Sequence, residues 1–203
     1  MARISFFIDG FNLYHAIADE PRFRRFRWID LTKLAQCFIP PQDHLTEVFY
    51  FTAFASWSPD KVARHRLFIR AQELNGVKPV YGEFRKKTKK CALCHQVFPT
   101  FEEKETDVNI AIQLLEQALK DSYDTAMIIS GDSDLLPALR AVKRNYPAKR
   151  FGIVIPPGRQ AELLKKEADF YRKIKFKHLD SCRMPDSISL GGGNILECPA
   201  NWR

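Results

Sequence analysis

Five short apolar runs, separated by longer segments with a helical repeat of apolar residues, constrain the fold of this chain more than any other feature. The runs are "ISFFID" (4–9), "EVFYFTA" (47–53), "VKPVYGEF" (77–84), "TAMIIS" (125–130) and "RFGIVIP" (150–156), with a weaker sixth, "KIKFKHL" (173–179). Strands that alternate with helices are typical of a parallel sheet covered by helices. The pattern predicts an α/β fold with a mainly parallel central sheet of about five or six strands.

Two of the intervening segments carry clear helix signals. The segment 58–76 begins with Ser-Pro-Asp and ends with Asn-Gly, which are residues typical of helix starts and stops. In the segment 105–121, apolar residues recur at helical spacing. These residues are Val108, Ala111, Ile112, Leu115 and Leu119. We therefore expect a helix in each segment.

The size and the charge of the chain limit its class. At 203 residues with 45% hydrophobic content, it can bury one sizeable core and need not be split in two. Lysine and arginine outnumber aspartate and glutamate by 32 to 24, which gives a net charge of +8. This balance favours polyanionic partners over acidic small molecules.

The N-terminus and the cysteines indicate the compartment. The apolar run in "MARISFFIDG" is too short for a signal peptide, and no stretch approaches the roughly 20 apolar residues of a membrane span. The five cysteines are an odd number, which favours reduced thiols over a disulfide framework. We predict a cytoplasmic protein with no membrane partner.

Acidic residues follow two of the predicted strands. Asp9 ends the first strand, and Asp132 and Asp134 follow the fourth in "IISGDSD". Ligands of open parallel sheets bind beyond the carboxyl ends of the strands, where the strand order reverses. If these two strands are neighbours, the three carboxylates meet at one crevice, and Asn12 lies one helical turn beyond Asp9. Taken alone, the pair after the fourth strand could simply cap a helix.

A fourth acid, Asp107, lies at the end of a helical row that includes Ala111 and Leu114 and should face the sheet. Four carboxylates within a few ångströms would raise one another's pKa unless a cation were present. Oxygen ligands of this kind suit Mg²⁺ or Mn²⁺ rather than Zn²⁺. Such a cation lowers the pKa of a bound water and neutralises phosphodiester oxygens, so the predicted chemistry is hydrolytic.

Three blocks, "FFIDGFNLYH", "KETDVNIAI" and "IISGDSDLLPAL", resemble the NYN domain family in its LabA-like branch, a relative of the PIN-domain ribonucleases. The resemblance runs from about residue 3 to "EADFYRKI" (167–174). It implies a PIN-like Rossmann-type three-layer sandwich and a metal-dependent endoribonuclease that hydrolyses RNA phosphodiester bonds. The catalytic and metal-site positions carried over by motif are Asp9, Asp107, Asp132 and Asp134, with Asn12 as a supporting polar group.

The chain divides into a domain and a tail. We expect residues 1–180 to form the NYN domain, with a Cys-x-x-Cys knuckle near 88–100. Residues 181–203 contain three glycines and two prolines without periodicity, which predicts an irregular C-terminal arm. Several apolar residues indicate that this arm packs on the domain: Ile188, Leu190, Ile195, Leu196 and Trp202.

Basic residues cluster in three stretches with interspersed aromatic residues. They are "RFRRFRW" (22–28), "RKKTKK" (85–90) and the segment 140–177. Such stretches could follow the phosphate backbone of single-stranded RNA while Phe23, Phe26 or Trp28 stack on bases, although charge runs are often only solvated surface. The predicted nucleic-acid contacts are Arg85, Lys86, Lys87, Lys89, Lys90 and, after the fifth strand, Arg159.

The motif "CALCH" (91–95) places two cysteines at the spacing that lets Cys91 and Cys94 bind one Zn²⁺. It is half of a zinc site, because the usual second pair is missing and His95 is the one further candidate ligand nearby. Free thiols in a surface knuckle are the alternative to structural zinc.

Two other functions fit parts of the sequence. An RNA-binding or regulatory module could keep the acids without turnover. An oxidoreductase could bind a dinucleotide on such a sheet, but "IDGFNLYH" lacks the G-x-G-x-x-G turn. A homodimer is left open by the sequence.

Overall fold

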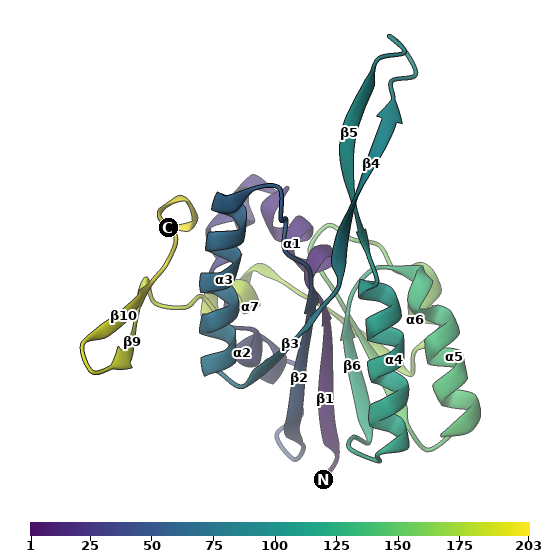
Figure 1. Cartoon of the computed structure of the whole chain (residues 1–203). Coiled ribbons are helices and arrows are strands. Elements are labelled where there is room, and N and C mark those ends of the chain that lie inside the picture. The colour runs from purple at the N-terminus through teal and green to yellow at the C-terminus, as the bar shows by residue number, and fades with distance from the viewer.

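A six-stranded sheet forms the centre of the protein in the computed structural model, which describes residues 1–203 (Figure 1). Its strands, in spatial order, are β3 (Val77–Tyr81), β2 (His44–Thr52), β1 (Arg3–Asp9), β6 (Thr125–Ile129), β7 (Arg150–Ile155) and β8 (Phe170–Lys173). Every neighbouring pair is parallel. The predicted α/β fold with a parallel sheet is therefore confirmed.

Helices cover both faces of the sheet. The helices α1 (Gly10–Ala18), α2 (Leu31–Gln36), α3 (Pro59–Leu74) and α7 (Phe176–Ser181) share one hydrophobic core. The helices α4 (Thr106–Leu119), α5 (Leu136–Asn145) and α6 (Glu162–Glu167) share the other. Within β1, Phe6 and Phe7 enter opposite cores because successive side chains of a strand alternate between faces. The result is the predicted three-layer sandwich.

The strand order reverses between β1 and β6. The chain winds outward from β1 to β2 and β3, then returns to β6 on the other side of β1. The register pairs Ile8 with Ile129, so both strands end at the same edge of the sheet. This is the topological switch point at which open parallel sheets bind ligands, and it brings together the acids that follow the two strands.

The helix α4 buries only some of the apolar residues that recur along it at helical spacing. Ile110, Leu114 and Ala118 lie in the core, whereas Val108 and Leu119 are exposed. The buried and the exposed apolar residues both recur at helical spacing. The packing of α4 against the sheet and α5 determines which of them are buried. The row that begins at Asp107 does face inward, as predicted, because it contains Leu114 and Ala118.

Two predicted strands were wrong in part. The run 77–84 divides at Gly82, so that β3 stays in the sheet and β4 (Glu83–Lys90) leaves it to pair with β5 (Val97–Lys104). A Cβ at Gly82 would lie 2.6 Å from the carbonyl oxygen of Lys104, so the close approach of β5 requires glycine there. In the run 173–179, the last strand ends at Lys173, and α7 begins at Phe176.

Two hairpins extend from the sandwich (Figure 1). The β4–β5 hairpin projects from the carboxyl edge of the sheet, and we call it the basic arm. The C-terminal tail is less irregular than predicted, because β9 (Ser187–Gly191) and β10 (Asn194–Glu197) form an antiparallel pair. A short 3-10 helix, Ala200–Trp202, follows them and places Trp202 in a core. None of the helices combines the length and the apolarity that crossing a membrane requires.

Candidate active site

A polar hollow of about 270 Å³ opens at the carboxyl edge of the sheet, where the strand order reverses. We call it the acidic hollow. It is lined by Asp9, Asn12, Glu103, Asp107, Asp132 and Arg159, together with Phe11, His15 and Thr106. Three of the four predicted aspartates and the predicted asparagine therefore meet here, from β1, α1, α4 and the turn after β6.

Asp9 is the most buried acid of the hollow, with 5% of its surface exposed. One carboxylate oxygen accepts a hydrogen bond from the backbone N–H of Asn12 at 2.9 Å and so caps α1. The other accepts a hydrogen bond from the Ser130 hydroxyl at 2.8 Å. Burial raises the pKa of Asp9, these two bonds lower it in part, and the charges of Asp132 and Glu103 raise it further.

Ser130 and Asn12 hold the turn after β6 against β1. The Ser130 hydroxyl, which is fully buried, also accepts a hydrogen bond from the backbone N–H of Asp132 at 3.0 Å. The side-chain oxygen of Asn12 accepts one from the backbone N–H of Gly131 at 3.1 Å. Asn12 is thus a positioning residue in this structure. Ser130, which was not among the predicted site residues, links Asp9 to Asp132 through these bonds.

Asp107 lies in the first turn of α4 and is partly buried. Burial raises the pKa of Asp107 to about 6, and the charges of Asp132, Asp9, Glu103 and Asp134 add to that rise. A carboxylate is ordinarily stabilised at a helix N-terminus; burial and like charge act against that effect at Asp107.

Glu103 is a member of the hollow that the sequence did not identify as a site residue. It lies on β5 and accepts a hydrogen bond from the backbone N–H of Thr106 at 3.0 Å, which caps the start of α4. Only the pairing of β4 with β5 carries it to the hollow. No local sequence signal could have placed it there.

Asp134 does not line the hollow. Its side chain is exposed, and its backbone N–H donates to the Asp132 carboxylate at 3.0 Å. Asp132 and Asp134 therefore have different locations. Asp132 caps the 3-10 helix Ser133–Leu135 and lines the hollow, whereas Asp134 lies outside the hollow. Its charge still reaches Asp107.

The oxygen atoms that line the acidic hollow are of the kind that hard divalent cations prefer as ligands. Carboxylate and amide oxygens line the hollow. Burial, and then mutual repulsion, raise the pKa of Asp9 and Asp107, and a bound cation would offset both effects. No three His, Cys, Asp or Glu side chains anywhere in the structure are arranged so that they could already hold a metal ion.

The stability of the metal-free protein should depend on Asp107 in a defined pH window. The pKa of Asp107 is about 6 in the folded state against an ordinary value of 3.8, so the folded state binds the proton more tightly. Its contribution to stability is complete below about pH 4 and is lost as the pH rises through about 6. In urea titrations with a chelator, the gap in unfolding midpoint between wild type and Asp107→Asn should therefore change across this window. A gap that is constant with pH would contradict the assignment.

The predicted RNA contacts lie in two places. Arg159 lines the acidic hollow and forms a 3.8 Å ion pair with Asp19. The others lie on β4 of the basic arm, where all are exposed. Arg85 pairs with Glu83 and Glu105, and Lys87 pairs with Glu102. The remaining lysines of β4, Lys86, Lys89 and Lys90, have no carboxylate partner within 4.0 Å.

The expectation that aromatic residues of "RFRRFRW" stack on bases was wrong. Phe23, Phe26 and Trp28 are all buried in the core on the α1 face. The Trp28 indole N–H donates to the carbonyl of Pro185 at 2.9 Å, which ties this segment to the C-terminal tail. The intervening arginines remain on the surface.

The motif "CALCH" forms the tip of the basic arm, between β4 and β5. Cys91 is partly exposed and Cys94 is exposed, and neither forms a disulfide. Backbone N–H groups of Cys94 and Leu93 and the Cys94 side chain lower the pKa of the Cys91 thiol. No group of three candidate ligands exists here, so the structure does not support the predicted zinc site.

Comparison with known proteins gives one family and two relatives. The family model for the NYN domain matches residues 3–175. A 6-hydroxy-3-succinoylpyridine 3-monooxygenase of Pseudomonas putida (strain DSM 28022 / S16) is 24% identical, over 98% of this chain and 75% of that protein. The crystal structure of a protein of unknown function from Vibrio parahaemolyticus RIMD 2210633 superposes with a TM-score of 0.60 at 17% identity, over 86% of this chain and 94% of that one. That likeness supports the fold.

Proposed function

The chain belongs to the NYN domain family, whose members are typically nucleases, and we propose that it is a Mg²⁺- or Mn²⁺-dependent endoribonuclease. The observation that carries the proposal is the meeting of Asp9, Asp107 and Asp132 in one hollow at the switch point of the sheet. A buried acid with a raised pKa, beside further acids in a cleft, is typical of a functional site. Its place in the LabA-like branch, its cytoplasmic location and a homodimer remain predictions.

Six residues in and beside the hollow share three tasks in this proposal. Asp9, Asp107 and Asp132 would hold the cation, which when bound activates water and neutralises the phosphodiester. Ser130 and Asn12 keep the turn that carries Asp132 in place through their hydrogen bonds. Arg159 lies at the same hollow and supplies the positive charge that a phosphate would meet there.

The experiment that tests the proposal is incubation of purified protein with labelled single-stranded RNA in the presence of Mg²⁺, Mn²⁺ or a chelator. We expect internal cleavage that requires the divalent ion. Binding without cleavage under all three conditions would instead identify an RNA-binding module.

The basic arm is expected to contact the phosphate backbone. Replacing the unpaired Lys86, Lys89 and Lys90 by alanine should weaken RNA binding and reduce the slope of log affinity against log salt by about 2, since each contact with a single strand contributes about 0.7. The matched control replaces three exposed lysines that lie outside the three basic stretches: Lys33, Lys78 and Lys120. If both triple variants keep the wild-type slope, the arm is only a solvated surface.

An oxygenase or another oxidoreductase is the second candidate, because the named relative is a monooxygenase. A dinucleotide at the usual position on the sheet is disfavoured. The pyrophosphate would meet the N-terminus of α1, where the Asp9 carboxylate already accepts the Asn12 N–H and carries the wrong charge. A flavin or nicotinamide absorbance in the purified protein would favour this candidate over the nuclease.

A further inference from the structure

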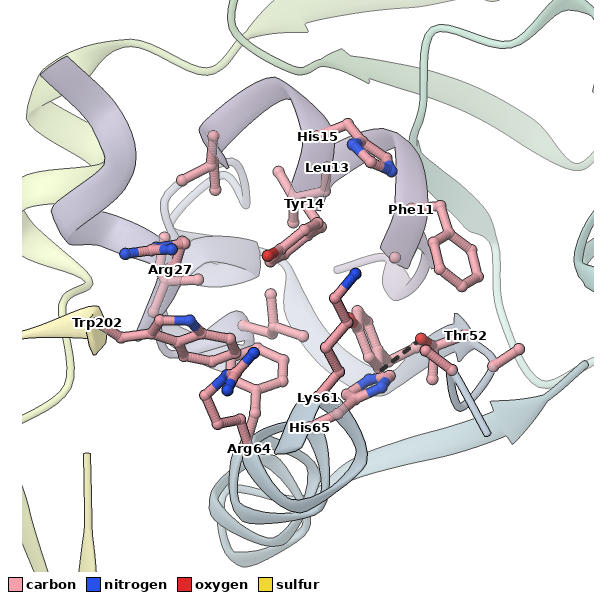
Figure 2. Close-up of a pocket in the computed structure, with 18 of the residues that line it drawn as sticks. Phe11, Leu13, Tyr14, His15, Arg27, Thr52, Lys61, Arg64, His65 and Trp202 are labelled. Atoms are coloured by element: carbon pink, nitrogen blue, oxygen red, sulfur yellow. Dashed lines mark hydrogen bonds between the residues drawn. The ribbon is translucent and has the colours of Figure 1, made fainter. Parts of the chain in front are cut away.

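A second cavity, of about 330 Å³, lies beside the acidic hollow and has no role in the proposed chemistry (Figure 2). We call it the aromatic cavity. It lies among α1, α3, the end of β2 and the C-terminal Trp202. Its volume is within the range of about 300–1,000 Å³ that is typical of ligand pockets. Thirteen of its twenty lining residues are hydrophobic.

The walls of the cavity are aromatic. Tyr50 and Phe68 are buried and line it from β2 and α3, with their ring centroids 5.8 Å apart. Tyr14, Trp57 and Trp202 also line it, and Tyr14 and Trp57 are more than a third exposed. Partly exposed aromatic rings around a hollow offer stacking surface to a flat ligand.

Cations lie at the edge of this aromatic surface. Lys61 and Arg64 project from α3 toward the cavity (Figure 2). Neither has a carboxylate partner within 4.0 Å, whereas Arg70 of the same helix pairs with Glu73 at 3.9 Å. Two unpaired cations beside stacked rings suit a ligand that carries both an aromatic ring and an anionic group.

Two polar groups that line the cavity, His65 and Thr52, carry no charge near neutral pH. His65 lies 3.2 Å from the Thr52 hydroxyl through its Nε2 atom. Burial lowers the pKa of His65 to about 4, so its ring is uncharged near neutral pH. A neutral imidazole and a hydroxyl both donate and accept hydrogen bonds, as the edge of a nucleobase requires.

The cavity and the acidic hollow are adjacent. Phe11 and His15, one turn apart on α1, line both. The basic arm touches both as well, because Phe84 of β4 lines the aromatic cavity and Glu103 of β5 lines the acidic hollow. Trp57 stacks on Phe101 of β5, with ring centroids 3.8 Å apart. A strand that follows the arm would meet both hollows.

We propose that the aromatic cavity is a nucleotide subsite, which accepts one unstacked RNA base while its phosphate lies at Lys61 and Arg64 and the neighbouring phosphodiester lies in the acidic hollow. The inference rests on the proposed ribonuclease function and adds a base-recognition element to it. An aromatic platform with flanking cations is the usual means of binding a single-stranded base.

The test measures binding apart from cleavage. We would titrate the Asp9→Asn protein in a calorimeter with the four nucleoside 5′-monophosphates, with ribose 5-phosphate and with nicotinate. These three kinds of probe distinguish binding of a base with its phosphate, of a sugar phosphate without a base, and of a small aromatic acid. We expect at least one nucleotide to bind about tenfold more tightly than the other two kinds of probe. The Lys61→Ala and Arg64→Ala changes together should weaken that binding at least about tenfold. The control is Arg70→Ala, an exposed arginine of the same helix that does not line the cavity.

Cleavage kinetics give a second, independent readout. With short oligonucleotides that differ in one base, Tyr14→Leu should raise KM and reduce the preference among bases while leaving kcat nearly unchanged. Tight nicotinate binding that excludes nucleotides would overturn the subsite and indicate a small aromatic acid as the ligand. Metal-dependent cleavage with no nucleotide binding and no change in these variants would also overturn it, while the nuclease stands. Nucleotide binding without any cleavage would retain the subsite and overturn the nuclease.

Discussion

The Asp9→Asn variant is expected to lose metal-dependent RNA cleavage by at least about 100-fold, because it removes the most buried negative ligand of the acidic hollow. The fold should survive. An asparagine oxygen can still accept the Asn12 N–H, and its amide N–H can donate to the Ser130 hydroxyl in place of the present bond. The change also removes a buried charge whose pKa is raised, so the metal-free variant should be at least as stable as wild type.

Single-turnover cleavage of labelled RNA in Mn²⁺, with a thermal melt of each protein, measures both effects of this change. The control is Asp60→Asn, an exposed acid in the first turn of α3 that lies outside the hollow. Wild-type cleavage by a folded Asp9→Asn protein would remove Asp9 from the site.

Replacing Asp132 and Asp134 separately should give unequal losses, although both residues belong to one motif. Asp132 lines the hollow and Asp134 is exposed outside it. We expect Asp132→Asn to reduce cleavage at least about 100-fold and Asp134→Asn about 10-fold or less, through its charge alone. The comparison is internally matched, since each change turns one aspartate of the same turn into asparagine. Equal losses would show that Asp134 enters the hollow when RNA or metal binds.

The fold could be predicted from the sequence because its signals are local and repeated. Five strands carry enough β-branched and aromatic residues to be found one by one, and their alternation with helices fixes a parallel sheet. The site followed from the same pattern. Once β1 and β6 are neighbours, Asp9 and Asp132 must meet at the carboxyl edge, and the inward row of α4 brings Asp107 to them.

The features that escaped prediction depend on contacts between distant segments. Glu103 reaches the hollow only because β4 leaves the sheet at Gly82 and pairs with β5. Trp28 looked like an exposed aromatic in a basic run, but the C-terminal tail covers it through Pro185. The aromatic cavity likewise needs Trp202, at the far end of the chain, to complete its wall. Periodicity in one segment carries no information about such partners.

The most direct test of the account is a crystal of the protein soaked in Mn²⁺ and measured at the manganese absorption edge. We predict anomalous density for at least one ion in the acidic hollow, within bonding distance of Asp9 and of Asp107 or Asp132, and its loss in Asp9→Asn. A fully soaked crystal with no density in the hollow, or with density unchanged by Asp9→Asn, would contradict a metal-dependent nuclease at this site.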